Sequence, residues 1–77
     1  MQDILNKLNP IFARVFEDET LQISEDSSAR DIDKWDSLRH VLLISEIEKA
    51  FNIHFELEEM IGFQNVGDIA RSLEKKV

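Results

Sequence analysis

Three consecutive residues, Asp36, Ser37 and Leu38, carry the side chains best suited to chemistry in this sequence. At the start of a helix, the serine hydroxyl would lie beside unpaired backbone amides and the positive end of the helix dipole. A phosphodiester linked to Ser37 would be stabilised there. Serine and aspartate are also common helix caps, so Asp36 and Ser37 taken alone favour a capping pair, and both interpretations stay open.

His40 follows the serine closely, but the spacing does not indicate a catalytic set. Asp36 and Ser37 are adjacent, so one helix start cannot place a carboxylate behind the imidazole and a hydroxyl before it. Neither His40 nor His54 has a second ligand at metal spacing. A later acidic cluster does not match a calcium-binding loop and is typical of a solvated face; it comprises Glu56, Glu58 and Glu59. We therefore predict no enzyme active site and no metal site.

Hydrophobic periodicity predicts that the elements around these residues form an all-α four-helix bundle. Apolar residues recur at helical spacing from Ile4 to Phe16. Pro10 lies inside that stripe and should kink the helix, or restart it with Asn9 as cap. A long polar loop over residues 17–36 follows. Its expected inward-facing residues are Leu21, Ile23, Ile32 and Trp35.

Three further helices follow the loop in this prediction. The second runs from about Ser37 to Phe51, and an extended connector then leads to a short third helix at Leu57–Ile61. The last helix runs from Val66 to about Lys75. The expected N-caps are Asp36 and Asn65, and the expected stops are Asn52 and Gly62.

The second helix has two apolar faces, although a surface helix in a small bundle needs only one. At about 100° per residue, one face comprises Leu43, Ile44, Ile47, Ala50 and Phe51. The opposite face comprises Leu38, Val41 and Leu42. Two interpretations of this second face stay open. Either the long loop covers it, or it is a docking surface for a partner, rimmed by Arg39, Glu46 and Glu48.

Composition narrows the class of protein further. The 77 residues suffice for one small domain, 1–77, with a thin core. The absence of cysteine excludes a disulfide framework and a thiolate metal site. A net charge of −7 opposes binding to nucleic acid or to acidic membranes and favours partners with positive patches. With no leader peptide or membrane-length apolar run, we expect a cytoplasmic protein, and we expect it to be a monomer.

In this setting the Asp36-Ser37-Leu38 motif resembles the attachment site of the acyl carrier proteins. The tripeptide alone occurs by chance in many proteins. The resemblance gains its strength from the whole chain, which is short, acidic and helical, with the motif at the start of a second helix after a long loop. Matching features after the motif are Ile47, Phe51 and the segment Ile53-His54-Phe55.

This resemblance implies that Ser37 carries a 4′-phosphopantetheine arm derived from coenzyme A, with Asp36 and Leu38 as motif neighbours. The arm would hold an acyl or aminoacyl group as a thioester, so the protein would be a carrier rather than an enzyme. Implied partners are a phosphopantetheinyl transferase, a loading ligase and acyl-processing or acyl-transferring enzymes. The expected docking residues are Leu38, Arg39, Val41, Leu42, Glu46 and Glu48. Side chains that could shelter an acyl chain inside the bundle are Ile44, Ile47, Phe55 and Ile69.

Residues around the motif depart from carriers of primary fatty-acid synthesis. Lys34 and Trp35 precede the motif where a glycine is usual, and Arg39 and His40 follow it where an acidic residue is usual. Added positive charge should weaken docking to an arginine-rich partner. We therefore expect a specialised carrier for a dedicated lipid, sugar or secondary-product pathway, in which Arg39 and His40 discriminate between partner enzymes. Neutral drift at the protein surface explains these two residues equally well. An alternative function is a small helical adaptor in which Ser37 only caps a helix.

Overall fold

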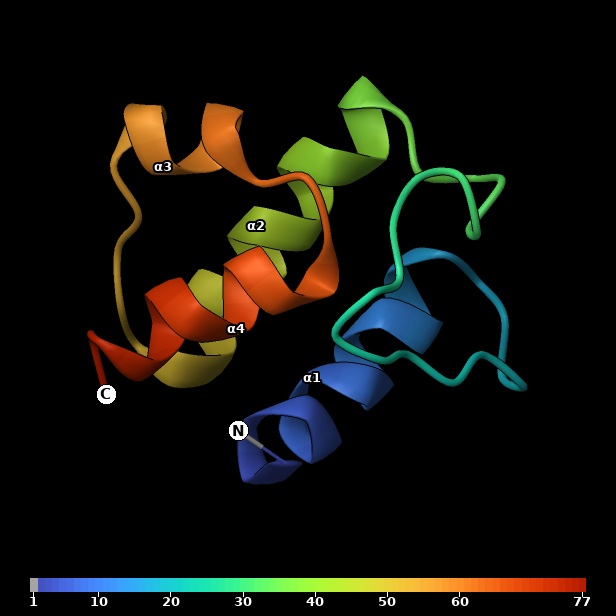
Figure 1. Cartoon of the computed structure of the whole chain (residues 1–77), viewed down its shortest axis with the longest axis horizontal. Coiled ribbons are helices and arrows are strands. Elements are labelled where there is room, and N and C mark those ends of the chain that lie inside the picture. The colour runs from blue at the N-terminus through green and yellow to red at the C-terminus, as the bar shows by residue number, and fades with distance from the viewer. Residues whose placement is uncertain (1) are drawn as a thin grey trace.

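The computed structural model describes residues 2–77 as four helices joined by loops (Figure 1). The helices are α1 (Gln2–Val15), α2 (Ser37–Phe51), α3 (Leu57–Gly62) and α4 (Val66–Glu74). Among these residues the only β-type pairing is an isolated bridge between Ser28 and Asn65. The predicted all-α fold, with its long first loop and short third helix, is confirmed.

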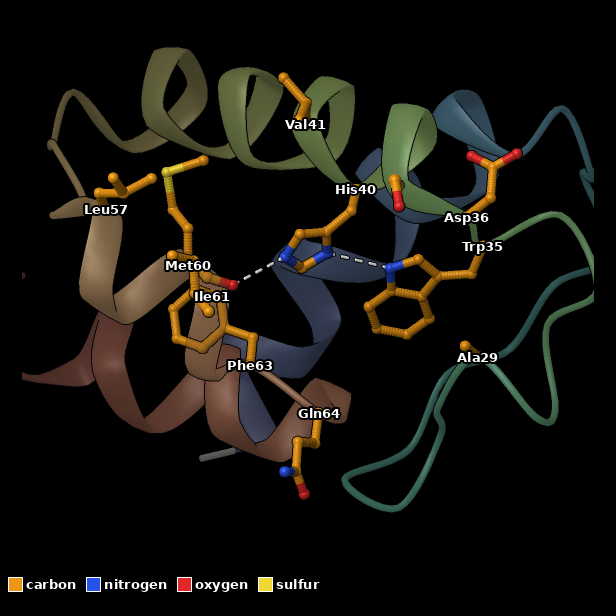
Figure 2. A pocket seen from close by; sticks show the side chains of 11 residues that line it. Ala29, Trp35, Asp36, His40, Val41, Leu57, Met60, Ile61, Phe63 and Gln64 are labelled. Carbon is orange, nitrogen blue, oxygen red and sulfur yellow. Dashed lines mark hydrogen bonds between the residues drawn. The ribbon is translucent and has the colours of Figure 1, made fainter.

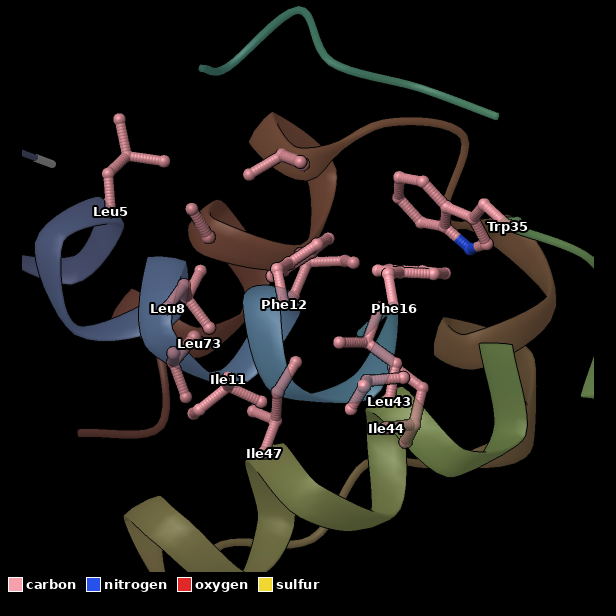
Figure 3. Packing of buried hydrophobic residues seen from close by; sticks show 14 of the residues in the cluster. Leu5, Leu8, Ile11, Phe12, Phe16, Trp35, Leu43, Ile44, Ile47 and Leu73 are labelled. Atoms are coloured by element: carbon pink, nitrogen blue, oxygen red, sulfur yellow. The ribbon is translucent and has the colours of Figure 1, made fainter. Parts of the chain in front are cut away.

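The helices surround one hydrophobic core, in which α1 packs against α2 and α4 (Figure 3). The loop contributes Ile32 and Trp35 to this core, and Leu21 and Ile23 pack against its edge. The fully buried side chains with the largest volumes are Phe12, Phe16, Phe55, Leu8, Leu43, Ile44, Ile47, Ile69, Leu73 and Val66. The residue immediately before the motif is thus anchored in the core, which fixes where α2 begins.

Of the two outcomes predicted at Pro10, a kink or a restart of the first helix, the restart does not occur. Helix α1 continues through Pro10, which is exposed, so water can satisfy the carbonyl that loses its amide partner. Asn9 does not cap a helix. Its side-chain amide donates to the Leu21 carbonyl oxygen at 2.9 Å, and its side-chain oxygen accepts from the Ile23 amide at 2.7 Å. Asn9 therefore fastens the long loop to α1.

Local capping signals fix the ends of α2 and the start of α4, as the sequence predicted. The Asp36 carboxylate accepts from the Arg39 amide at 2.8 Å, and the Asn65 side chain accepts from the Asp68 amide at 2.8 Å. Helix α2 ends at Phe51, and the next residue, Asn52, has a φ of 55° in the left-handed region that asparagine tolerates.

The middle of the long loop docks on the first turn of α4. The Val66 amide donates to the Ser27 carbonyl and the Gly67 amide to the Glu25 carbonyl, both at 2.9 Å. Those amides have no partner inside their own helix, so the loop supplies the missing acceptors. A Cβ atom at Gly67 would lie only 2.9 Å from the Glu25 carbonyl oxygen, so this close approach requires glycine.

One residue of the predicted buried face of α2 is exposed. Leu43, Ile44 and Ile47 are buried and Phe51 is partly buried, as expected, but Ala50 faces solvent. Ala50 lies about 60° around the helix from Ile47, at the edge of the buried stripe, where helical spacing alone does not decide burial.

Candidate functional site

Ser37 is the first residue of α2, and its side chain is exposed. The Asp36 carboxylate caps the helix, while the Ser37 hydroxyl makes no hydrogen bond within residues 2–77. In the same range, the amides of Ser37 and Leu38 meet no protein acceptor, as expected at a helix start. The structure therefore separates the two roles that the sequence left open: Asp36 caps, and the serine oxygen remains available to a reagent.

A groove of about 500 Å³ opens beside Ser37, between α2, α3 and the loop (Figure 2). Its surface is mainly apolar. The lining residues are Ala29, Trp35, Asp36, Ser37, His40, Val41, Leu57, Met60, Ile61, Phe63 and Gln64. A group attached to Ser37 would have this hollow as its nearest apolar shelter.

His40 joins two sides of this groove. The Trp35 indole Nε1–H donates to His40 Nδ1 at 3.0 Å, and His40 Nε2 lies 3.0 Å from the Met60 carbonyl oxygen. The indole can only donate and the carbonyl can only accept, so these two contacts require a neutral imidazole with its proton on Nε2. Sequence reasoning treated His40 as a surface residue and missed this bridge from the loop to α3.

The second apolar face of α2 is open to solvent, so the long loop does not cover it. Leu38, Val41 and Leu42 are 69%, 55% and 48% exposed. Helix α3 adds Leu57 and Ile61, which are 67% and 74% exposed and share the groove with Val41. We call these five residues the apolar patch. Sequence reasoning missed its α3 half because a single helical turn shows too little periodicity to assign a face.

The charged residues predicted to rim the docking face all have partners within the chain. The Arg39 guanidinium donates to the Val15 carbonyl at the end of α1. Glu46 accepts from Arg14 at 2.9 Å, and Glu48 accepts from the Phe55 amide at 2.8 Å. These contacts hold α1 and the connector to α2. A docking role for Arg39, Glu46 and Glu48 stays a prediction.

Glu59 ties α3 to α4, whereas the sequence indicated a solvated face. Its carboxylate accepts from the Ser72 hydroxyl at 2.6 Å and from the Glu56 amide at 2.8 Å, and pairs with Lys76 at 3.0 Å. The Ser72 hydrogen bond, followed by the other two contacts, lowers the pKa of Glu59 to about 2. These polar contacts matter because α3 has no fully buried side chain of its own.

The predicted interior shelter for an acyl chain is filled by side chains. Ile44, Ile47, Phe55 and Ile69 are all at most 1% exposed and belong to the continuous core. None of them lines the groove beside Ser37. The hollow nearest to the serine is therefore at the surface of the bundle.

Comparisons with known proteins agree with this geometry. The family described as "Phosphopantetheine attachment site" matches residues 6–73. The acyl carrier protein of Streptococcus pyogenes serotype M1 is 36% identical over 73 residues, which cover 95% of both chains. The solution structure of a holo acyl carrier protein from Geobacter metallireducens is 44% identical, with a TM-score of 0.89, over 95% of this chain and 84% of that one.

A solved structure at lower identity supports the fold alone. It is that of a putative acyl carrier protein from Mycobacterium tuberculosis, with 24% identity and a TM-score of 0.83, covering 94% of this chain and 96% of its own. The fold is thus shared across divergent sequences.

The chain belongs to the acyl carrier protein family, whose members are carriers and not catalysts. Its cofactor is a covalently bound 4′-phosphopantetheine, and acyl-processing enzymes are its partners. The residues present fit that group: an exposed serine hydroxyl and open helix-start amides lie beside an apolar groove. Within residues 2–77, no cluster of side chains could hold a metal ion, and no helix has the length and apolarity of a membrane span.

Proposed function

We propose that Ser37 Oγ is the attachment atom for the 4′-phosphopantetheine arm, on a single domain that spans residues 1–77. The observation that carries this proposal is the exposed hydroxyl at the first residue of α2, without a hydrogen-bond partner among the described residues. In the attachment step, Ser37 Oγ forms a bond to the phosphorus that carries pantetheine in coenzyme A. Adenosine 3′,5′-bisphosphate leaves, and the hydroxyl proton passes to a base of the transferase.

The chain's own residues would position the linkage. Asp36 fixes the first turn of α2 through its bond to the Arg39 amide, so the amides of Ser37 and Leu38 stay directed toward a phosphate on the serine. Trp35, which precedes this turn, is buried in the core and would anchor it. When bound, the arm supplies a terminal thiol that holds an acyl or aminoacyl group as a thioester.

We further propose that partner enzymes dock on the apolar patch, next to Ser37. The expected partners are a phosphopantetheinyl transferase, a loading ligase and acyl-transferring enzymes. The exposed side chains of Leu38, Val41 and Leu42 support this proposal, since an apolar surface of this kind on a small protein is typical of a contact site. The net charge of −7 would steer partners with positive patches toward the carrier. A cytoplasmic location stays a prediction from the sequence.

An intact-mass experiment tests the attachment. The purified protein is incubated with coenzyme A and a broad-specificity phosphopantetheinyl transferase and is then weighed. We expect a mass increase of one phosphopantetheinyl group in the wild type and in Ser45→Ala, a control serine on the same helix, but not in Ser37→Ala. An unmodified wild type with every transferase tried would contradict the proposal and favour the adaptor. A modified Ser37→Ala variant would place the arm elsewhere.

A further inference from the structure

Three aromatic rings in contact form the inner side of the groove. Trp35 and His40 stack with ring centroids 6.0 Å apart, and His40 meets the edge of Phe63 at 6.4 Å. Figure 2 shows the imidazole between Trp35 and Met60, with its two hydrogen bonds running to opposite sides. The row continues on both sides into the core, from Trp35 to Phe12 and from Phe63 to Phe55. We call Trp35, His40 and Phe63 the aromatic wall.

His40 is the member of the wall that two hydrogen bonds hold in place. If its ring moved away, the Trp35 indole N–H, on a residue only 9% exposed, would lose its acceptor. The Met60 carbonyl oxygen would lose its donor at the same time. A polar group that is buried without a partner costs more than its hydrogen bond contributes, so both contacts resist opening together.

Buried side chains of α2 that follow His40 fill the adjoining core. The aliphatic residues of the core nearest in sequence to His40, Leu43 and Ile44, are at most 1% exposed. Protein cores are close-packed, and inserted methylene groups force neighbouring side chains out of their preferred conformations. An acyl group that passed the wall would have to break the two His40 hydrogen bonds and then displace packed side chains.

We propose that His40 is a positioning residue that keeps the wall closed, so that the cargo lies outside the core, in the groove along Trp35, Val41 and Met60. The chain then selects acyl groups short enough to lie in this groove, and longer chains gain no further shelter. This inference rests on the proposed attachment at Ser37, because only a cargo tethered there starts at the mouth of the groove.

The test loads Ser37 with a series of straight-chain acyl groups, from acetyl to dodecanoyl, by supplying the transferase with the corresponding acyl-coenzyme A molecules. Intact mass confirms each loading, and the melting temperature of each form is compared with that of the protein carrying the bare arm. In the wild type we expect the melting temperature to rise over the short acyl groups and then to stop rising. In His40→Ala the rise should stop at a longer acyl chain than in the wild type, because the space left by the imidazole can take further methylene groups.

Two control variants separate this role from a general structural one. His40→Gln retains one donor and one acceptor, so it should restore the plateau of the wild type, which a mere loss of stability would not do. His54→Ala removes an exposed histidine away from the groove and should behave as the wild type does. Emission from Trp35, the single tryptophan, should respond to short acyl groups in the wild type, since they lie against its ring.

The outcomes distinguish the two levels of the proposal. Absence of loading at Ser37 would overturn the proposed function itself. Successful loading with a wild-type melting temperature that rises steadily to dodecanoyl would leave the carrier function intact and overturn the role of His40. That decision needs only the wild-type series, so it holds even if His40→Ala does not fold.

Discussion

The replacement Gly67→Ala puts two physical effects in opposition. Inside a helix, alanine is favoured over glycine by about 1 kcal/mol, so helix propensity alone predicts that α4 becomes more stable. The structure predicts the reverse, because the new Cβ would lie 2.9 Å from the Glu25 carbonyl oxygen and 3.1 Å from the Arg71 guanidinium. The arginine side chain can move away, but the carbonyl belongs to the backbone that docks the long loop.

The expected loss of stability follows from the contacts that must change to make room for the new Cβ atom. Moving the loop outward weakens the bonds from Gly67 to Glu25 and from Val66 to Ser27, each worth about 0.5–1.5 kcal/mol. Overpacking at a close contact typically adds about 1–3 kcal/mol. After the propensity gain is subtracted, we expect the free energy of unfolding to fall by at least about 1 kcal/mol. For a domain of this size, the melting temperature should then fall by at least about 4 °C.

Thermal and urea unfolding, followed by far-ultraviolet circular dichroism, measure this difference. Gly62→Ala is the matched control, since a Cβ atom at Gly62 would meet nothing within 4 Å, and it should leave stability unchanged or raise it. If Gly67→Ala raises the melting temperature as Gly62→Ala does, the close approach of the loop to α4 is not required, and our account of the docking is wrong.

Two further predictions concern α3 and the apolar patch. The lowered pKa of Glu59 means that its contacts stabilise the fold above the ordinary pKa near 4.5, and that this contribution is lost as pH falls toward about 2. The melting temperature of Glu59→Gln should therefore lie below that of the wild type at neutral pH and match it near pH 2. The control Glu58→Gln, at an exposed position, should melt with the wild type at every pH. If the melting temperatures of Glu59→Gln and the wild type differ by the same amount at every pH, the contact of Glu59 with α4 does not act as we describe. Val41→Glu should change the free energy of unfolding by no more than about 0.5 kcal/mol, because the side chain is exposed, yet slow the modification of Ser37 by the transferase. Leu43→Glu, in the buried stripe, is the contrasting variant, and equal losses of stability in the two would show that the patch is part of the core.

The parts of the fold that the sequence predicted are those set by local signals. Asp36 and Asn52 lie at the two ends of α2, and each acts on backbone groups only a few residues away, so residue type and spacing sufficed. At Pro10 the sequence allowed a kink or a restart, and only the restart is wrong, because α1, packed on α2 and α4, is one continuous helix.

The missed features depend on residues that are distant in sequence. His40 meets Met60 twenty residues further on, and Glu59 meets Ser72 thirteen residues further on. A histidine or glutamate has the same local pattern whether it faces solvent or joins two helices, so only the packed structure reveals these contacts. The candidate attachment residue was accessible from sequence, whereas the wall beside it was not.

The side chain of Asn9 has a consequence for the order in which the chain assembles. By holding the backbone at Leu21 and Ile23, it closes a segment of fewer than fifteen residues. The entropic cost of closure rises with length, so contacts at this separation are among the cheapest non-helical ones available to the chain. Residues 2–23 can therefore fold early, before α2 and α4 pack against α1 and complete the bundle.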